Sequence, residues 1–167
     1  IHGISEKQGN EILDILKDKC ILDDCESNNV KSTSDFIDML GKRAGDEVCF
    51  GIYGPQVGRF RMVKAKGNMR NENDLYKSEY SWVQREIFSK TFENEDGGKY
   101  INPVYDAEEV VKAVDTGKGY LGVLMRPTNV DEFVSIVTRG WRLPAKATNF
   151  FPKPPAGMVM QNLSGDL

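Results

Sequence analysis

Five segments of the chain carry apolar residues at the spacing of an amphipathic α-helix. In the first, Ile12, Ile15 and Leu16 share one stripe, and Ser5 with Gln8 three residues later is typical of a helix start. The pattern predicts helices over residues 5–18, 32–43, 79–92, 107–117 and 128–140.

The later helices also have recognisable N-cap residues and apolar faces. Thr33 or Ser34 is the expected N-cap of the second helix, and Asp106 is the expected N-cap of the fourth. In the last helix four apolar residues stand at i, i+3, i+4 and i+7, so we expect them to face inward: Val130, Phe133, Val134 and Val137.

Other stretches alternate or are continuously apolar, which is typical of strands. Residues 48–53 and 59–66 are separated by the turn-like sequence GPQVG, and this predicts an antiparallel hairpin. Residues 120–127 read as a buried strand, 157–163 as a final strand, and 100–106 as extended.

Together these elements indicate one α+β domain over residues 1–167, with a mixed, partly antiparallel sheet and helices packed on it. A chain of this length can bury a single core. The residues expected to be mostly buried are Ile12, Ile15, Leu16, Phe36, Phe50, Ile52, Val83, Ile87, Val111, Val114, Leu121, Val123, Phe133 and Val137.

Composition narrows the class of protein. A net charge of −3 and a pI near 5.3 argue against a nucleic-acid binder, which is usually basic. No apolar run approaches the roughly 20 residues that span a bilayer, so we expect a soluble protein without a membrane partner. The three cysteines, Cys20, Cys25 and Cys49, have no disulfide-framework spacing, which favours free thiols, a reducing cytoplasmic compartment and no metal site.

One stretch near the C-terminus is unusual. The sequence LPAKATNFFPKPPAGMVM, residues 143–160, holds four of the chain's seven prolines, and no acidic residue occurs between Phe133 and Gly165. Prolines stiffen a backbone, and locally unpaired cations attract anions. The candidate anion-binding residues are Arg142, Lys146, Thr148, Asn149 and Lys153.

A purely structural interpretation of this stretch stays open. Prolines cannot donate to a sheet ladder, so composition alone rather favours a strap that covers a sheet edge, anchored by Phe150 and Phe151. Catalytic signatures are missing: no phosphate-binding loop, dinucleotide fingerprint or nucleophile elbow is present. The only histidine is His2, a candidate cleft residue at the start of the chain.

The C-terminal stretch resembles the P-x-K-x-T-x-F-x-P-K signature of a prokaryotic family catalogued as domain of unknown function one thousand and fifteen. Lys146, Thr148 and Phe150 match this signature, as does the pair Pro152–Lys153. Upstream, YDAEEVVKAVDTGKGYLGVLMRPTNVDEFVSIV, SWVQREIF and IHG are similar to further segments of that family. Ala147 and Gly3 depart from it, since the family has serine and arginine there.

The resemblance implies that this chain is the C-terminal part of a longer protein. Members of the family carry an N-terminal half with a D-G-H-H-R motif, similar to one in ParB-like nucleotide-dependent proteins. That half would be the partner of this domain, and the cofactor stays unknown.

Two functions remain as hypotheses. The first is an accessory domain that binds a small anion such as phosphate through Lys146 and Lys153, and that is not an enzyme by itself. The second is a non-catalytic scaffold that docks another domain or subunit.

Overall fold

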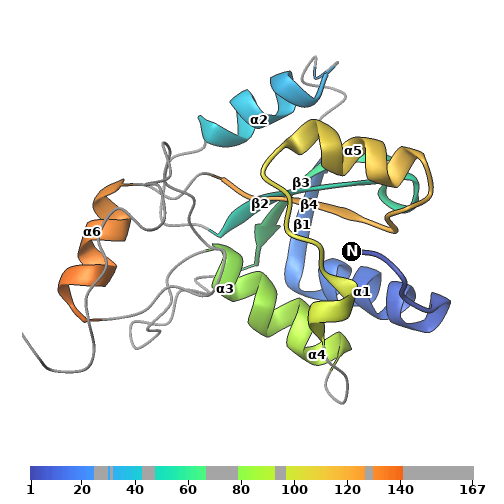
Figure 1. The fold of residues 1–167 in the computed structure, drawn as a ribbon, viewed down its shortest axis with the longest axis horizontal. Coiled ribbons are helices and arrows are strands. Elements are labelled where there is room, and N and C mark those ends of the chain that lie inside the picture. The colour runs from blue at the N-terminus through green and yellow to red at the C-terminus, as the bar shows by residue number, and fades with distance from the viewer. Residues whose placement is uncertain are drawn as a thin grey trace, which may run out of the picture.

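The structure is a computed structural model that describes residues 1–24, 30, 32–42, 48–66, 79–92, 97–126 and 130–140. Helices surround a four-stranded sheet in this part of the chain, which confirms the α+β class (Figure 1). The expected strand over 157–163 and the proline-rich stretch lie outside the described residues, as does Cys25.

The sheet has the strand order β1-β3-β2-β4, and every strand pair in the described part is antiparallel. Its strands are β1 (Cys20–Asp24), β2 (Cys49–Gly54), β3 (Arg59–Ala65) and β4 (Gly122–Leu124). The predicted hairpin is confirmed as β2 and β3, joined by a short 3-10 turn. Among the strands that the structure describes, β1 and β4 are therefore the two edges of the sheet.

β1 was not predicted from the sequence. It begins where helix α1 (Glu6–Lys19) ends, because Cys20 already has an extended backbone. Two acidic residues of β1 meet cations of β3: the Asp24–Arg61 ion pair measures 2.8 Å, and the Asp23–Lys64 pair measures 2.7 Å. Cross-strand ion pairs thus stabilise a strand that carries little apolar alternation.

β2 is buried along its whole length because helices cover both faces of the sheet. Phe50 and Ile52 face α1 and α3 (Glu79–Val83), while Cys49 and Tyr53 face the opposite helices. This period of two is the alternation of a pleated strand.

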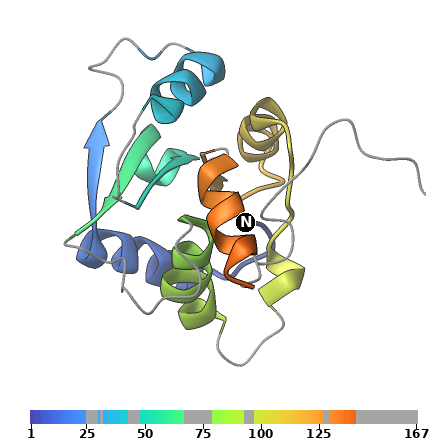
Figure 2. The ribbon, with the colours of Figure 1, turned by 90° about the vertical axis from the view of Figure 1, so that its left-hand side faces the viewer.

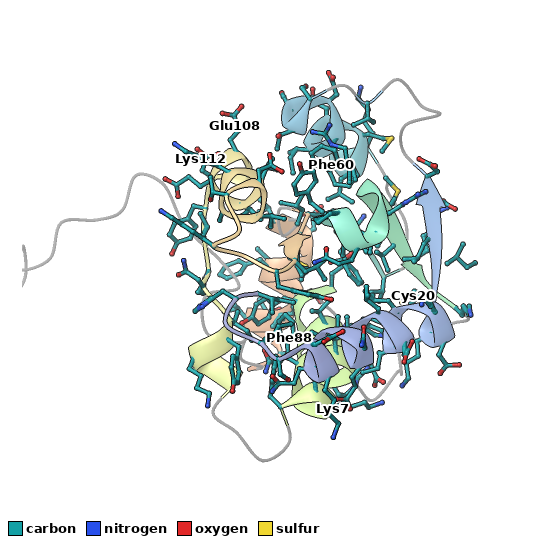
Figure 3. The ribbon with its side chains drawn as sticks, turned by 90° about the vertical axis from the view of Figure 1, so that its right-hand side faces the viewer. Lys7, Cys20, Phe60, Phe88, Glu108 and Lys112 are labelled. Carbon is teal, nitrogen blue, oxygen red and sulfur yellow. The ribbon has the colours of Figure 1, made fainter. Side chains whose placement is uncertain are left out.

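The helices on the second face are α2 (Thr33–Gly41) and α5 (Ala107–Asp115). Figure 3 shows Phe60 in the core between these helices, and Phe88 in the other core, next to α1. The sheet therefore separates two apolar layers.

The N-cap predictions can be compared with the structure directly. The capping box of Ser5 and Gln8 and the Asp106 cap are confirmed. The expectation of Thr33 or Ser34 was wrong: Ser32 is the N-cap of α2, because its hydroxyl accepts from the backbone N–H of Asp35.

The predicted helix over 79–92 is present but not uniform. After α3, residues Gln84–Phe88 form a π-helical segment, and α4 (Ser89–Thr91) ends the run. The backbone N–H and hydroxyl of Ser89 both donate to the carbonyl oxygen of Gln84, five residues earlier.

Most of the predicted core is confirmed. Buried residues are Ile12, Leu16, Phe36, Phe50, Ile52, Val83, Ile87, Val114 and Leu121. Half-buried residues are Ile15, Val111, Val123 and Phe133. Val137 is exposed, and it belongs to the helix that departs furthest from prediction.

Helix α6 (Val130–Thr138) forms where expected, but its orientation was predicted wrongly. Val130, Val134 and Val137 are exposed by 73%, 49% and 51%, while Ile136 is buried. Figure 1 shows α6 set apart from the sheet, beyond the end where α3 begins, and Figure 2 views the molecule from this side, with α6 in front. At this position no described element covers the valine stripe, so periodicity alone did not identify the buried side.

Candidate functional site

A pocket of about 250 Å³ lies along the outer edge of β4. Four parts of the chain enclose it: the start of α3, the end of β4, the first turns of α5 and the extended residues 101–105. Its lining consists of Ile1, Glu79, Tyr80, Phe88, Ile101, Asn102, Pro103, Val104, Tyr105, Ala107, Val110, Val123, Leu124, Met125 and Arg126.

A buried ion pair forms part of the wall of this pocket. Arg126, two residues after β4, donates from Nη2 to the carboxylate of Glu79 in the first turn of α3. The two side chains are only 15% and 10% exposed. Charges withdrawn from water in this way need a partner, so the pair links the start of α3 to the end of β4.

The remaining walls are mostly apolar. Phe88, Ile101, Val110 and Val123 contribute hydrocarbon surface, whereas Tyr105 is 70% exposed and lies at the rim. A largely apolar chamber with a charged pair in its wall is typical of sites that hold a small molecule or a side chain.

Two other surface depressions are larger in volume but more open than the β4 pocket, so they are weaker candidates for a binding site. One of about 840 Å³ is an open surface over α1, lined largely by charged side chains such as Glu6, Lys7 and Asp14. Another of about 440 Å³ lies under the hairpin turn, near Leu13 and Gly58. The β4 pocket is smaller, but it combines enclosure, apolar walls and a buried charge pair.

The residues proposed from the sequence have different outcomes. His2 is half-buried beside the pocket, and its backbone N–H donates to the carbonyl oxygen of Tyr100 at 2.9 Å, but Ile1 lines the pocket instead. The anion-binding candidates lie outside the described residues and stay predictions: Arg142, Lys146, Thr148, Asn149 and Lys153.

Sequence reasoning missed Glu79 and Arg126. A faint signal existed, since Arg126 lies within the predicted buried strand 120–127, where a cation is costly unless it is paired. The partner could not be identified in this way, because Glu79 lies 47 residues earlier.

A second charged cluster surrounds Glu86 on the π-helical segment. Its carboxylate accepts from Lys19, from Lys90 at 2.7 Å and from Arg85 at 3.0 Å, and its side chain is 15% exposed. Burial alone would raise the pKa of Glu86, but these hydrogen bonds outweigh it and lower the pKa from 4.5 to about 2. The same contact with Glu86 raises the pKa of Lys19. The cluster ties α1 to the segment Gln84–Phe88.

Glu86 should make folding sensitive to acid. A carboxylate whose pKa is lower in the folded state stabilises it above the unfolded pKa, and this contribution is lost as pH falls toward the folded value. Between pH 4.5 and about 2, wild type should therefore lose on the order of 2 kcal/mol relative to Glu86→Gln, after allowance for solvent screening. Urea denaturation at a series of pH values measures this difference.

The matched control for Glu86→Gln is Asp14→Asn, which removes a carboxylate that is 77% exposed on α1. Its stability difference from wild type should stay constant over the same pH range. Parallel acid profiles for wild type and Glu86→Gln would contradict the role of Glu86.

Two further titratable groups lie in the core. Burial, followed by a 2.6 Å hydrogen bond to Asp115, raises the pKa of Tyr53, and this bond fastens α5 to β2. Burial raises the pKa of the Cys20 thiol to about 12, which leaves too little thiolate for nucleophilic chemistry. Cys20 and Cys49 are both buried in the core, and neither forms a disulfide.

Comparisons with protein-family models, with curated proteins and with solved structures find no match to this chain. Within the described ranges, no helix has the length and apolar character needed to cross a membrane. In the same part of the chain, no three histidine, cysteine or acidic side chains come together as metal ligands.

Proposed function

We propose that this chain is an accessory binding domain, and that it holds its ligand in the β4 pocket. The observation that carries the proposal is a partly enclosed, largely apolar chamber whose wall includes the buried Glu79–Arg126 pair. Burying two charges costs free energy, and a buried charge pair in a pocket wall is more typical of a binding site than of a simple surface hollow.

The pocket chemistry supports binding rather than catalysis. Glu79 is the carboxylate of the described lining, and the guanidinium of Arg126 already engages it. A general base must be able to take a proton from the substrate, whereas this carboxylate already accepts a hydrogen bond from a guanidinium. The preferred ligand is amphipathic, with an apolar body and a polar group that reaches the ion pair.

Anilinonaphthalene sulfonate is a suitable probe, because it joins an apolar ring system to an anion. Its fluorescence should rise on binding at one site and saturate. Val104→Trp, which fills the pocket from the 101–105 segment, should weaken this binding roughly tenfold.

Ile21→Trp provides the matched control for this experiment. Ile21 is 52% exposed on β1, the opposite edge of the sheet, so this variant adds the same ring away from the pocket. Its probe affinity should equal that of wild type. Equal binding by wild type and Val104→Trp would show that the pocket is not the site.

The anion-binding hypothesis for the proline-rich stretch also stands as a proposal, supported by the sequence alone. We expect Lys146→Met/Lys153→Met to abolish phosphate binding while the far-UV circular dichroism stays unchanged. Calorimetric titration with phosphate at two salt concentrations measures this, and wild-type affinity should fall as salt rises. Lys7→Met/Lys118→Met, at two exposed positions, controls for net charge.

The scaffold hypothesis predicts a different outcome for the same double variant. If Lys146 and Lys153 dock the N-terminal half of a longer protein, their replacement should weaken that association and leave phosphate binding unaltered. Equal phosphate affinity in wild type and variant would therefore remove the anion site and favour docking.

A further inference from the structure

The Glu79–Arg126 pair limits the charge that a ligand of the β4 pocket can carry. Both residues line the pocket, and both side chains are buried. Arg126 donates to the Glu79 carboxylate, so this part of the wall holds one positive and one negative charge that neutralise each other. The described lining has no further acidic, lysine or arginine side chain. A charged ligand group placed here would therefore lose water without gaining an unpaired counter-charge.

An uncharged hydrogen-bonding group suits this wall better than an ion does. A hydroxyl both donates and accepts, so it can donate to Glu79 and accept from Arg126 without changing the balance of charge. A carboxylate would face Glu79 as a like charge, and an ammonium group would face Arg126 in the same way. The wall therefore favours a neutral polar group over an anion or a cation.

The rest of the pocket limits the size and polarity of the ligand. Phe88, Ile101, Val110 and Val123 give it apolar walls. A dry apolar cavity of about 150 Å³ holds one benzene ring, so the volume of about 250 Å³ gives room for a fused pair of rings. Tyr105 is exposed at the rim, where a charged group such as the sulfonate of anilinonaphthalene sulfonate can stay in water.

We propose that the ligand of the β4 pocket is a small uncharged organic molecule, with an apolar body the size of a fused pair of rings and a hydroxyl-type group that bonds to the Glu79–Arg126 pair. The inference rests on the proposed function, because it names the ligand class of the same site. In this arrangement Glu79 sets the charge selectivity: it neutralises Arg126 and so disfavours anions that the guanidinium alone would attract.

Three naphthalene derivatives, substituted at the same ring position, test this assignment. At neutral pH naphthylmethanol is uncharged, naphthoate is an anion and naphthylmethylammonium is a cation. Wild type should bind the alcohol roughly tenfold more tightly than either ion, because only the alcohol gains hydrogen bonds to the buried pair. Equilibrium dialysis measures the three dissociation constants. Val104→Trp should weaken binding of the alcohol, and Ile21→Trp should leave it unchanged.

Glu79→Gln tests the origin of the selectivity. The change leaves the guanidinium of Arg126 in the wall without the Glu79 carboxylate, so this variant should bind naphthoate at least about tenfold more tightly than the alcohol. Glu108→Gln is the matched control: it removes the same charge from an exposed position in the first turn of α5, and it should keep the wild-type preference. The wild-type series does not depend on either variant, so it decides the assignment even if Glu79→Gln does not fold.

The outcomes separate this inference from the proposed function. Equal or tighter binding of either ion by wild type would overturn the uncharged ligand and keep the pocket as the site. A folded Glu79→Gln that still prefers the alcohol would overturn the selectivity assigned to Glu79. Saturable binding of anilinonaphthalene sulfonate without binding of any naphthalene derivative would also overturn this inference. Failure of all four probes to bind would overturn the proposed function as well.

Discussion

Replacing Arg126 with methionine should lower the free energy of unfolding by about 3–5 kcal/mol. The change leaves the Glu79 carboxylate buried at the pocket wall without its guanidinium. Removing one member of a buried pair is costly, because the remaining charge stays withdrawn from water and has lost its opposite charge. Chemical denaturation monitored by circular dichroism measures this loss.

A second variant distinguishes charge from packing. Glu79→Gln/Arg126→Met removes both charges, so it should regain most of the stability lost by Arg126→Met. Arg85→Met serves as the matched control: its side chain is 44% exposed, and its loss should cost about 1 kcal/mol or less. If Arg126→Met and Arg85→Met lose the same stability, the pair is not effectively buried.

Phe36→Ala should also destabilise the fold by about 3–5 kcal/mol, because Phe36 is fully buried between α2 and the sheet. Its ring lies against Gly51 of β2, where an added Cβ would come within 2.3 Å of Phe36 Cε1. Gly51→Ala alone should therefore cost about 1–3 kcal/mol by overpacking. Thermal and urea denaturation measure both changes.

The two changes should compensate in part. Removal of the Phe36 ring makes room for a methyl group at Gly51, so the double variant should be more stable than the sum of the single losses implies. Leu16→Ala lies in the core on the other face, and its effect should add to that of Gly51→Ala without compensation. Strict additivity of Phe36→Ala and Gly51→Ala would contradict the contact.

Local pattern was sufficient for most of the fold. The Ser5–Gln8 capping box and the β2–β3 hairpin are short-range devices, so sequence reading located them closely. Phe50 and Ile52 were also predicted correctly as core residues. They alternate along β2 and face one helix layer, while a second helix layer covers the other face.

Features that depend on distant partners could not be read in this way. β1 owes its place to β3, whose Arg61 and Lys64 neutralise Asp24 and Asp23. In α6 the valine stripe has helical periodicity, but periodicity cannot say which neighbour, if any, covers it.

The candidate site likewise combines a feature visible in the local sequence with one that depends on distant residues. Composition directed attention to the proline-rich stretch, which remains a prediction outside the described residues. The β4 pocket instead arises from Ile1, Glu79, Ile101 and Arg126, which are far apart in sequence and share no motif. Only the folded sheet edge brings them together.

The π-helical segment Gln84–Phe88 has a consequence for how this chain can change length. An α-helix turns by about 100° per residue and bonds each N–H to the carbonyl oxygen four residues earlier. The N–H of Ser89 bonds instead to Gln84, five residues earlier, so this turn holds one residue more than an α-helical turn. Deleting Arg85 would restore α-helical winding without disturbing α3, but it would move Glu86 one position back and turn it by about 100° around the helix axis. Glu86 would then lose its position beside Lys19. The segment is thus a natural point for single-residue insertion or deletion, and the Lys19–Glu86 contact favours the longer form.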